Sequence, residues 1–154
     1  MGDLKQELKQ RRPFRSLAHE AHLSILRTAA QFEHAFESAL KPHGVTATQY
    51  NVLRILRGAE PTGLCRQEIG ARMLRRVPDV TRLLDRLEDL RLVVRERGGS
   101  DRRLVTTRIT AAGLKVLAGL DPVADKLTGA VLGRLDEADL RALIDLLGRV
   151  RDRM

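Results

Sequence analysis

The chain has 154 residues, of which 43% are hydrophobic and 31% charged, and this composition excludes intrinsic disorder and suffices for the core of one domain. No apolar run approaches the roughly 18 residues of a membrane span, and the polar start lacks a secretory signal. We therefore expect a cytoplasmic protein with no membrane partner. The single cysteine, Cys65, excludes an internal disulfide, and the four histidines lack zinc-ligand spacing, so we expect no metal and no cofactor.

The positive charge is unevenly distributed along the chain. The formal net charge is +8, and arginine supplies 23 of the 28 cationic residues. The segment 54–108 alone contains 14 arginines, no lysine and 8 acidic residues. The arginine fork suits phosphates and guanine edges, but a GC-rich genome also enriches arginine, so composition alone leaves both explanations open. The concentration in this segment predicts a surface for an anionic partner such as nucleic acid.

The N-terminal part predicts a basic arm followed by a long helix. In residues 1–15 we expect a mobile arm or a short helix that stops near Pro13. Residues 16–41 repeat apolar side chains at steps of three and four on more than one face, which is typical of a helix covered by a second subunit. His19 and His22 share one face of this helix, and without a third ligand we interpret them as structural or exposed side chains.

Three shorter helices are predicted next. Thr46 and Gln49 have the spacing of a capping box at the start of a helix that ends near Gly58. A short helix follows from about Cys65 to Met73, and Pro78 is placed in the first turn of the next one. Two short helices with a tight connection, the second polar on its outer face, are typical of a helix-turn-helix. The expected outer residues are Pro78, Asp79, Thr81, Arg82, Asp85 and Arg86.

A hairpin and two further helices complete the chain. The runs 92–97 and 102–109 are strand-like and flank a glycine-rich turn, which predicts a hairpin. Its charged tip is expected to hold Arg95, Arg97, Arg102 and Arg103. Thr110 is expected to cap the next helix, and Asp136 starts the last one. The last helix carries an apolar stripe of Leu140, Leu143, Ile144, Leu147 and Val150.

Four motifs combine into one signature. They are the helical run 79–88 (DVTRLLDRLE), Leu92-Val93, Asp101-Arg102-Arg103 and Ile109-Thr110. In this combination the chain resembles the multiple antibiotic resistance regulator (MarR) family over nearly its whole length. The spacing of the two arginines after Asp101 and the later threonine is similar to the wing signature of that family.

The resemblance implies a mainly α fold with a small β-hairpin wing. One domain is expected over residues 1–154, in which a winged helix-turn-helix, 46–109, lies between dimerisation helices at 16–41 and 110–154. The resemblance also implies a homodimer that binds a pseudo-palindromic operator in double-stranded DNA. Its recognition helix would enter the major groove and its wing the minor groove.

The candidate DNA-binding residues lie mostly on the second helix of the motif and on the wing. Arg82 and Arg86 share an exposed face, and Arg82 lies nearer the end from which recognition helices read bases. The alternative is a solvated face whose charges pair with Asp85. By resemblance, Asp101 braces the wing. The full set of candidates is Arg66, Arg75, Arg76, Pro78, Asp79, Thr81, Arg82, Arg86, Arg95, Arg97, Arg102 and Arg103.

The resemblance implies a transcriptional regulator, which we interpret as a repressor released by a small phenolic or other anionic effector. The effector pocket would lie among the first, second and fifth helices of the family, with His22 and Tyr50 as candidate lining residues. The alternative is a nucleoid-type or low-specificity winged-helix protein without an effector. The sequence has no nucleophile elbow, Walker A or H-E-x-x-H motif, so we expect no enzyme.

Two positions depart from the pattern of the family. Arg91 stands where glycine is common after the recognition helix, and a left-handed backbone there costs about 1 kcal/mol for a residue with a side chain. Cys65 stands where threonine or serine is usual. We interpret Cys65 as a structural thiol, and the alternative is a redox sensor at a helix start.

Overall fold

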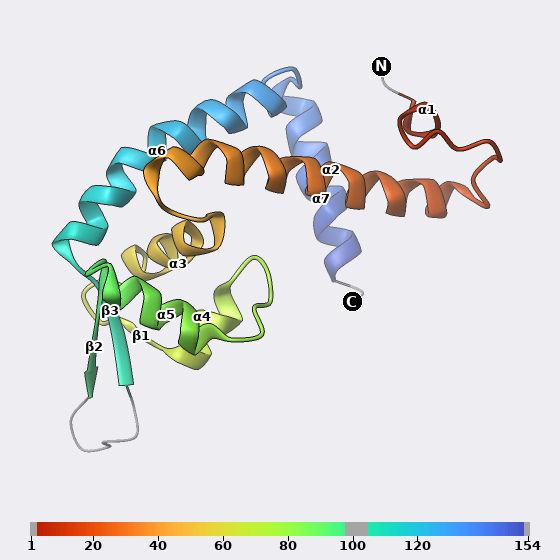
Figure 1. The fold of residues 1–154 in the computed structure, drawn as a ribbon. Coiled ribbons are helices and arrows are strands. Elements are labelled where there is room, and N and C mark those ends of the chain that lie inside the picture. The colour runs from red at the N-terminus through yellow and green to blue at the C-terminus, as the bar shows by residue number, and fades with distance from the viewer. Residues whose placement is uncertain (1–2, 98–104, 153–154) are drawn as a thin grey trace.

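The computed structural model describes residues 3–97 and 105–152. In this part of the chain, the long helices lie on one side of a group of shorter helices, and a small antiparallel sheet lies at the opposite edge of the molecule, so the expected mainly α fold with a hairpin wing is confirmed (Figure 1). The elements are α1 (Leu4–Glu7), α2 (Leu17–Leu40), the 3-10 helix η1 (Lys41–His43), α3 (Ala47–Arg57), β1 (Leu64–Cys65), α4 (Arg66–Arg72), α5 (Val80–Asp89), β2 (Val93–Arg97), β3 (Val105–Ile109), α6 (Ala111–Leu132) and α7 (Glu137–Arg151).

The helix starts follow the capping chemistry of the sequence. The predicted capping box is confirmed, because Gln49 N–H donates to Thr46 Oγ1 at 3.1 Å and Thr46 N–H donates to Gln49 Oε1 at 2.9 Å. Thr110 and Asp136 cap α6 and α7 as expected. The placement of Pro78 in the first turn of α5 is wrong. Asp79 caps that helix by accepting from Arg82 N–H at 2.9 Å, and side-chain capping moves the start beyond the proline.

The sheet contains a third strand that the sequence reading missed. Leu64 pairs with Thr107 and Cys65 with Thr106, which gives the order β1-β3-β2. Cys65 is therefore both the end of a strand and the N-cap of α4, and its N–H donates to Glu68 Oε2 at 2.8 Å. Gly63 precedes this strand with φ +74°, and a Cβ there would lie 2.7 Å from the Thr107 carbonyl oxygen. A strand of two residues is too short to show periodicity.

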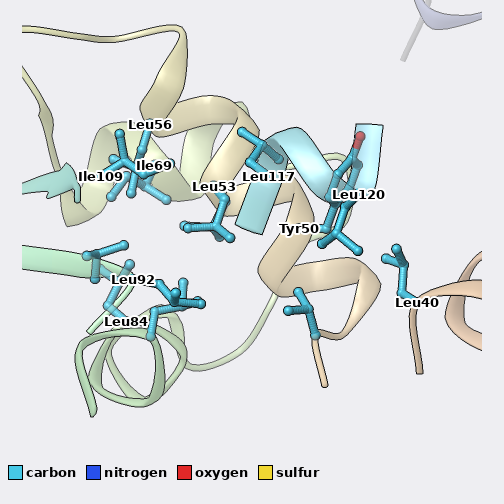
Figure 2. Close-up of a cluster of buried hydrophobic side chains, with 14 of the residues drawn as sticks. Leu40, Tyr50, Leu53, Leu56, Ile69, Leu84, Leu92, Ile109, Leu117 and Leu120 are labelled. Atoms are coloured by element: carbon cyan, nitrogen blue, oxygen red, sulfur yellow. The ribbon is translucent and has the colours of Figure 1, made fainter. Parts of the chain in front are cut away.

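The buried core joins helices α3, α4 and α5 and the sheet to the first part of α6 and the end of α2. Figure 2 shows leucine and isoleucine side chains from α3, α4, α5, α6 and the sheet meeting around Leu53. Helix α2 buries only its last residue, Leu40, and no residue of α7 is buried. The core residues are Leu40, Val45, Tyr50, Val52, Leu53, Leu56, Leu64, Ile69, Leu84, Leu87, Leu92, Val93, Ile109, Leu117, Leu120 and Ala124.

Apolar side chains on the flanking helices remain exposed. Leu17 and Leu26 of α2 are 85% and 53% exposed, and Ile144 of α7 is 67% exposed. Helices α2 and α6 pack side by side above α4, α5 and the sheet (Figure 1). Within residues 3–97 and 105–152, no helix has the length and hydropathy to cross a membrane. The exposed stripes of α2 and α7 are the surfaces that we expect a second subunit to cover.

Candidate nucleic-acid interface and adjoining cavity

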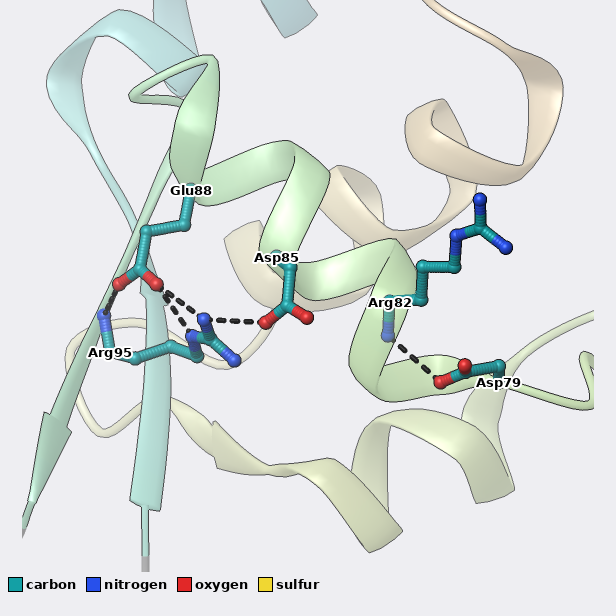
Figure 3. A network of polar contacts seen from close by, with 5 residues as sticks. All are labelled: Asp79, Arg82, Asp85, Glu88 and Arg95. Atoms are coloured by element: carbon teal, nitrogen blue, oxygen red, sulfur yellow. Dashed lines mark hydrogen bonds and ion pairs between the residues drawn. The ribbon is translucent and has the colours of Figure 1, made fainter.

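Helix α5 presents a polar face outward because its apolar face is held in the core. Leu84 and Leu87 are 2% and 0% exposed, whereas Thr81, Arg82 and Arg86 are all exposed. Among the described residues, neither the Arg82 nor the Arg86 side chain forms an ion pair, and Figure 3 shows the Arg82 guanidinium apart from the neighbouring carboxylates. Both guanidinium groups therefore remain available to an anionic partner, as a recognition helix requires.

The candidates around α4 are more scattered. Arg66 is the first residue of α4, and Arg76 and Pro78 lie exposed in the loop between α4 and α5. Arg75 turns toward α2, where its Nη1 lies 3.1 Å from Glu33 Oε2. This pair is largely exposed and is therefore weak, but it joins a flanking helix to the loop that precedes α5.

Arg95 does not belong to the wing tip, so this part of the expectation is wrong. Its guanidinium turns back to α5, where Nη2 contacts Glu88 Oε2 at 2.5 Å and Asp85 Oδ1 at 2.7 Å (Figure 3). The hydrogen bond from Arg95 holds the pKa of Glu88 below its ordinary value. Arg97 stays exposed at the end of β2, and Asp101, Arg102 and Arg103 lie outside the described residues.

The connection between α5 and β2 is short and well bonded. Arg91 has φ 59°, so the left-handed backbone considered for this position is present without a glycine. Thr110 Oγ1 donates to the Arg91 carbonyl at 2.8 Å, and Leu92 N–H donates to the Leu87 carbonyl at 3.0 Å. These bonds fix the base of the hairpin against the end of α5.

A cavity of about 280 Å³ lies between α2, α3 and the residues after α4. Of the two candidate lining residues, Tyr50 lies in the wall of this cavity, whereas His22 lies exposed nearer the start of α2 and does not. The expected contribution of α6 is also missing from its wall. The lining residues are Phe32, Glu33, Phe36, Glu37, Ala47, Thr48, Tyr50, Asn51, Arg54, Met73, Leu74 and Arg75.

Tyr50 points past the cavity to α6. Its hydroxyl donates to Asp121 Oδ1 at 3.1 Å, and Arg57 Nη1 donates to Asp121 Oδ2 at 2.5 Å. Burial raises the pKa of Tyr50, and the hydrogen bond to Asp121 raises it further. The Arg57 guanidinium holds the pKa of Asp121 below its ordinary value. This network ties α3 to α6, and α6 therefore meets Tyr50 at its hydroxyl end.

The cavity wall includes polar groups with defined partners. The Arg54 guanidinium lies 5.9 Å from the centre of the Tyr50 ring. Asn51 Oδ1 accepts from Leu74 N–H at 3.1 Å. Sequence reasoning missed Asn51 and Glu33, since the partners lie 23 and 42 residues away and no local pattern marks such pairs. The wall thus joins α2 and α3 to the loop that precedes α5.

Known proteins with similar sequences or folds are regulators. The sequence model of the MarR family matches residues 43–104. The chain is 34% identical to the HTH-type transcriptional regulator TtmR of Methylorubrum extorquens over 139 residues, which cover 90% of this chain and 69% of TtmR. It is 38% identical to a MarR transcription factor from Planctomyces limnophilus, with a TM-score of 0.68 and coverage of 88% and 98%.

A more distant structure shows the same fold with a ligand-controlled function of its own. Bordetella bronchiseptica BpsR is 21% identical, with a TM-score of 0.76, and the match covers 86% of this chain and 98% of BpsR. Its DNA binding is regulated by 6-hydroxynicotinic acid. At this identity the likeness supports the fold alone.

Proposed function

Because the chain belongs to the MarR family of DNA-binding transcriptional regulators, we propose that it is a repressor that a small aromatic acid releases from a palindromic operator. The observation that carries the proposal is the exposed face of α5, where Arg82 and Arg86 are free of ion pairs among the described residues. A rigid helix with free cationic side chains can enter the major groove and read base edges.

In this proposal, Arg82 reads a base and the wing contacts the adjacent groove. Arg82 lies near the start of α5, the end that recognition helices direct at the bases. Arg97 is exposed at the end of β2, from which the hairpin extends. A narrow minor groove concentrates negative potential and attracts arginine. The helix thus supplies most of the sequence preference, and the wing supplies affinity.

The cavity beside Tyr50 is the proposed effector site. Phe32, Phe36 and Met73 offer an apolar wall for an aromatic ring. Arg54 and Arg75 can pair with the carboxylate of such a ligand. A carboxylate at Arg75 competes with Glu33, so binding loosens the contact between α2 and the loop before α5. That displacement moves the recognition helix and weakens DNA binding.

Footprinting on the DNA upstream of the gene tests the proposal. We expect the protein to protect one inverted repeat, and this protection should disappear when 6-hydroxynicotinic acid or benzoic acid is added. Arg54→Met should bind the operator normally but respond less to the acid. Arg27→Met is the matched control, since Arg27 lies on α2 outside the cavity wall, and it should respond like the wild type.

Two results would contradict the proposal. Protection of many unrelated sites with equal affinity would favour the nucleoid-type alternative. If the protein protects a single operator and no aromatic acid releases the protein from it, the proposed effector is excluded and the protein is a constitutive regulator.

A further inference from the structure

Arg95 connects the wing to the recognition helix through several bonds. Its backbone N–H donates to Glu88 Oε1 at 3.1 Å, and its Nε donates to Glu88 Oε2 at 2.8 Å. Its Nη2 contacts both Glu88 and Asp85, at 2.5 and 2.7 Å (Figure 3). Asp85 and Glu88 are three residues apart and so share one face of α5. The Arg95 side chain is only 25% exposed.

These bonds provide a second fixed point for the hairpin. The first fixed point is the short turn at Arg91, which holds only the base of β2. Strand β1 holds the other strand of the hairpin, β3, at Thr106 and Thr107, whereas β2 is the edge strand of the sheet and pairs with β3 alone. Arg95 lies farther along β2, opposite the buried Thr107 of β3, and binds the side of α5. Two separated attachments fix the angle between a strand and a helix, which one attachment cannot do.

The charge of this cluster argues against a direct role in DNA binding. One guanidinium lies between two carboxylates, so the group carries a net negative charge. A phosphate would have to displace at least one carboxylate in order to pair with Arg95. The neighbouring Arg97 is exposed and has no ion pair among the described residues, so it is the better phosphate partner.

We propose that Arg95 is a positioning residue, which locks the wing at one angle to the recognition helix through Glu88 and Asp85, so that the two elements reach neighbouring grooves together. This inference rests on the proposed operator binding by α5 and the wing. It makes Glu88 and Asp85, two acidic residues that face no base, necessary for tight DNA binding.

A double-mutant cycle on the operator separates positioning from direct contact. Arg95→Met and Glu88→Ala should each weaken operator binding about tenfold, and the double variant should be no weaker than either one. The two substitutions change the net charge of the protein in opposite directions, so a loss of operator affinity in both variants cannot come from the charge. In both variants, minor-groove protection beside the operator should disappear while major-groove protection by α5 persists.

Matched controls use neighbouring residues with the same charges. Asp89→Ala removes an exposed carboxylate of α5 outside the cluster, and it should leave binding unchanged or slightly tighter. Arg97→Met should reduce the salt dependence by about one unit of slope while the minor-groove protection by the wing persists, whereas Arg95→Met should lose that protection together with the wing's share of the slope. Arg95→Lys keeps the charge but lacks the fork. The Arg95→Lys variant should protect the minor groove only partly. It takes the place of Arg95→Met if the Met variant does not fold.

Other results would overturn the inference. If Arg95→Met weakens binding while Glu88→Ala tightens it, or if the double variant is additive, Arg95 acts by its charge on DNA. If the wild-type protein protects no operator at all, the proposed function fails first, and the footprint shows this before any variant is compared.

Discussion

The region around α3, α4, α5 and the sheet buries its apolar side chains in a different way from the flanking helices. Helices α3, α4 and α5, the sheet and part of α6 share one core within a single chain. Helix α7 carries an equally clear apolar stripe and buries none of it. The first region buries its apolar side chains within one chain, whereas we propose that the second buries its own against another copy. The stability of the first region should therefore be independent of protein concentration, whereas the stability of the second region should rise with it.

The largest expected effect is in the complete region. Leu53 is fully buried where α3 meets the rest of the core, so Leu53→Ala should lower the free energy of unfolding by about 2–5 kcal/mol. Denaturant unfolding at two protein concentrations measures this loss, which should be the same at both. Leu26→Ala is the control on α2, where the side chain is 53% exposed. An equal loss in both variants would break the distinction between the two regions.

A charge on the apolar stripe of α7 should separate the subunits. Ile144 is 67% exposed in the single chain, so Ile144→Asp should leave that chain folded and raise the dimer dissociation constant about a hundredfold. Light scattering across a concentration series measures the constant. Asp145→Asn, one position along the helix and already polar, should leave it unchanged. A wild-type protein that is monomeric at micromolar concentration would contradict the account.

A smaller effect is expected at the joint between the two regions. Because Arg57 depresses the pKa of Asp121, the ion pair adds stability above the ordinary carboxyl pKa of 3.8, and this stability is lost as the pH falls through the depressed value. Asp121→Asn should therefore flatten the acid limb of the stability curve and lower stability slightly at pH 7. Thermal unfolding between pH 2 and 7 tests this, and an acid limb identical to that of the wild type would exclude the role of Asp121.

Local patterns predicted the helices well but missed contacts between them. The starts of three helices were predicted correctly from Thr46, Thr110 and Asp136, because capping depends only on residues that are neighbours in the sequence. The strand Leu64–Cys65 was missed because its partners in the sheet, Thr107 and Thr106, lie 43 and 41 residues away in the sequence. Arg95 was placed at the wing tip because charge alone cannot show which carboxylate a side chain will meet.

The cavity shows the same limit. Tyr50 was predicted to line it, while His22 was not distinguishable from Phe32 or Glu33 on the same helix. Which face of a long helix lines a cavity depends on how the helix is rotated against its neighbours. Periodicity identifies apolar faces, but α2 has more than one of them.

The role of α5 as the reader of DNA is tested most directly by one set of binding curves. Arg82→Ala, Arg97→Ala and the wild type are titrated with the cognate operator and a scrambled duplex over a salt series. Arg82→Ala should lose about 1–3 kcal/mol on the operator and much less on the scrambled duplex. Arg97→Ala should weaken both and lower the salt slope by about one unit. If Arg82→Ala weakens both duplexes equally while Arg97→Ala alone erases the preference, the wing reads the sequence and the account is contradicted.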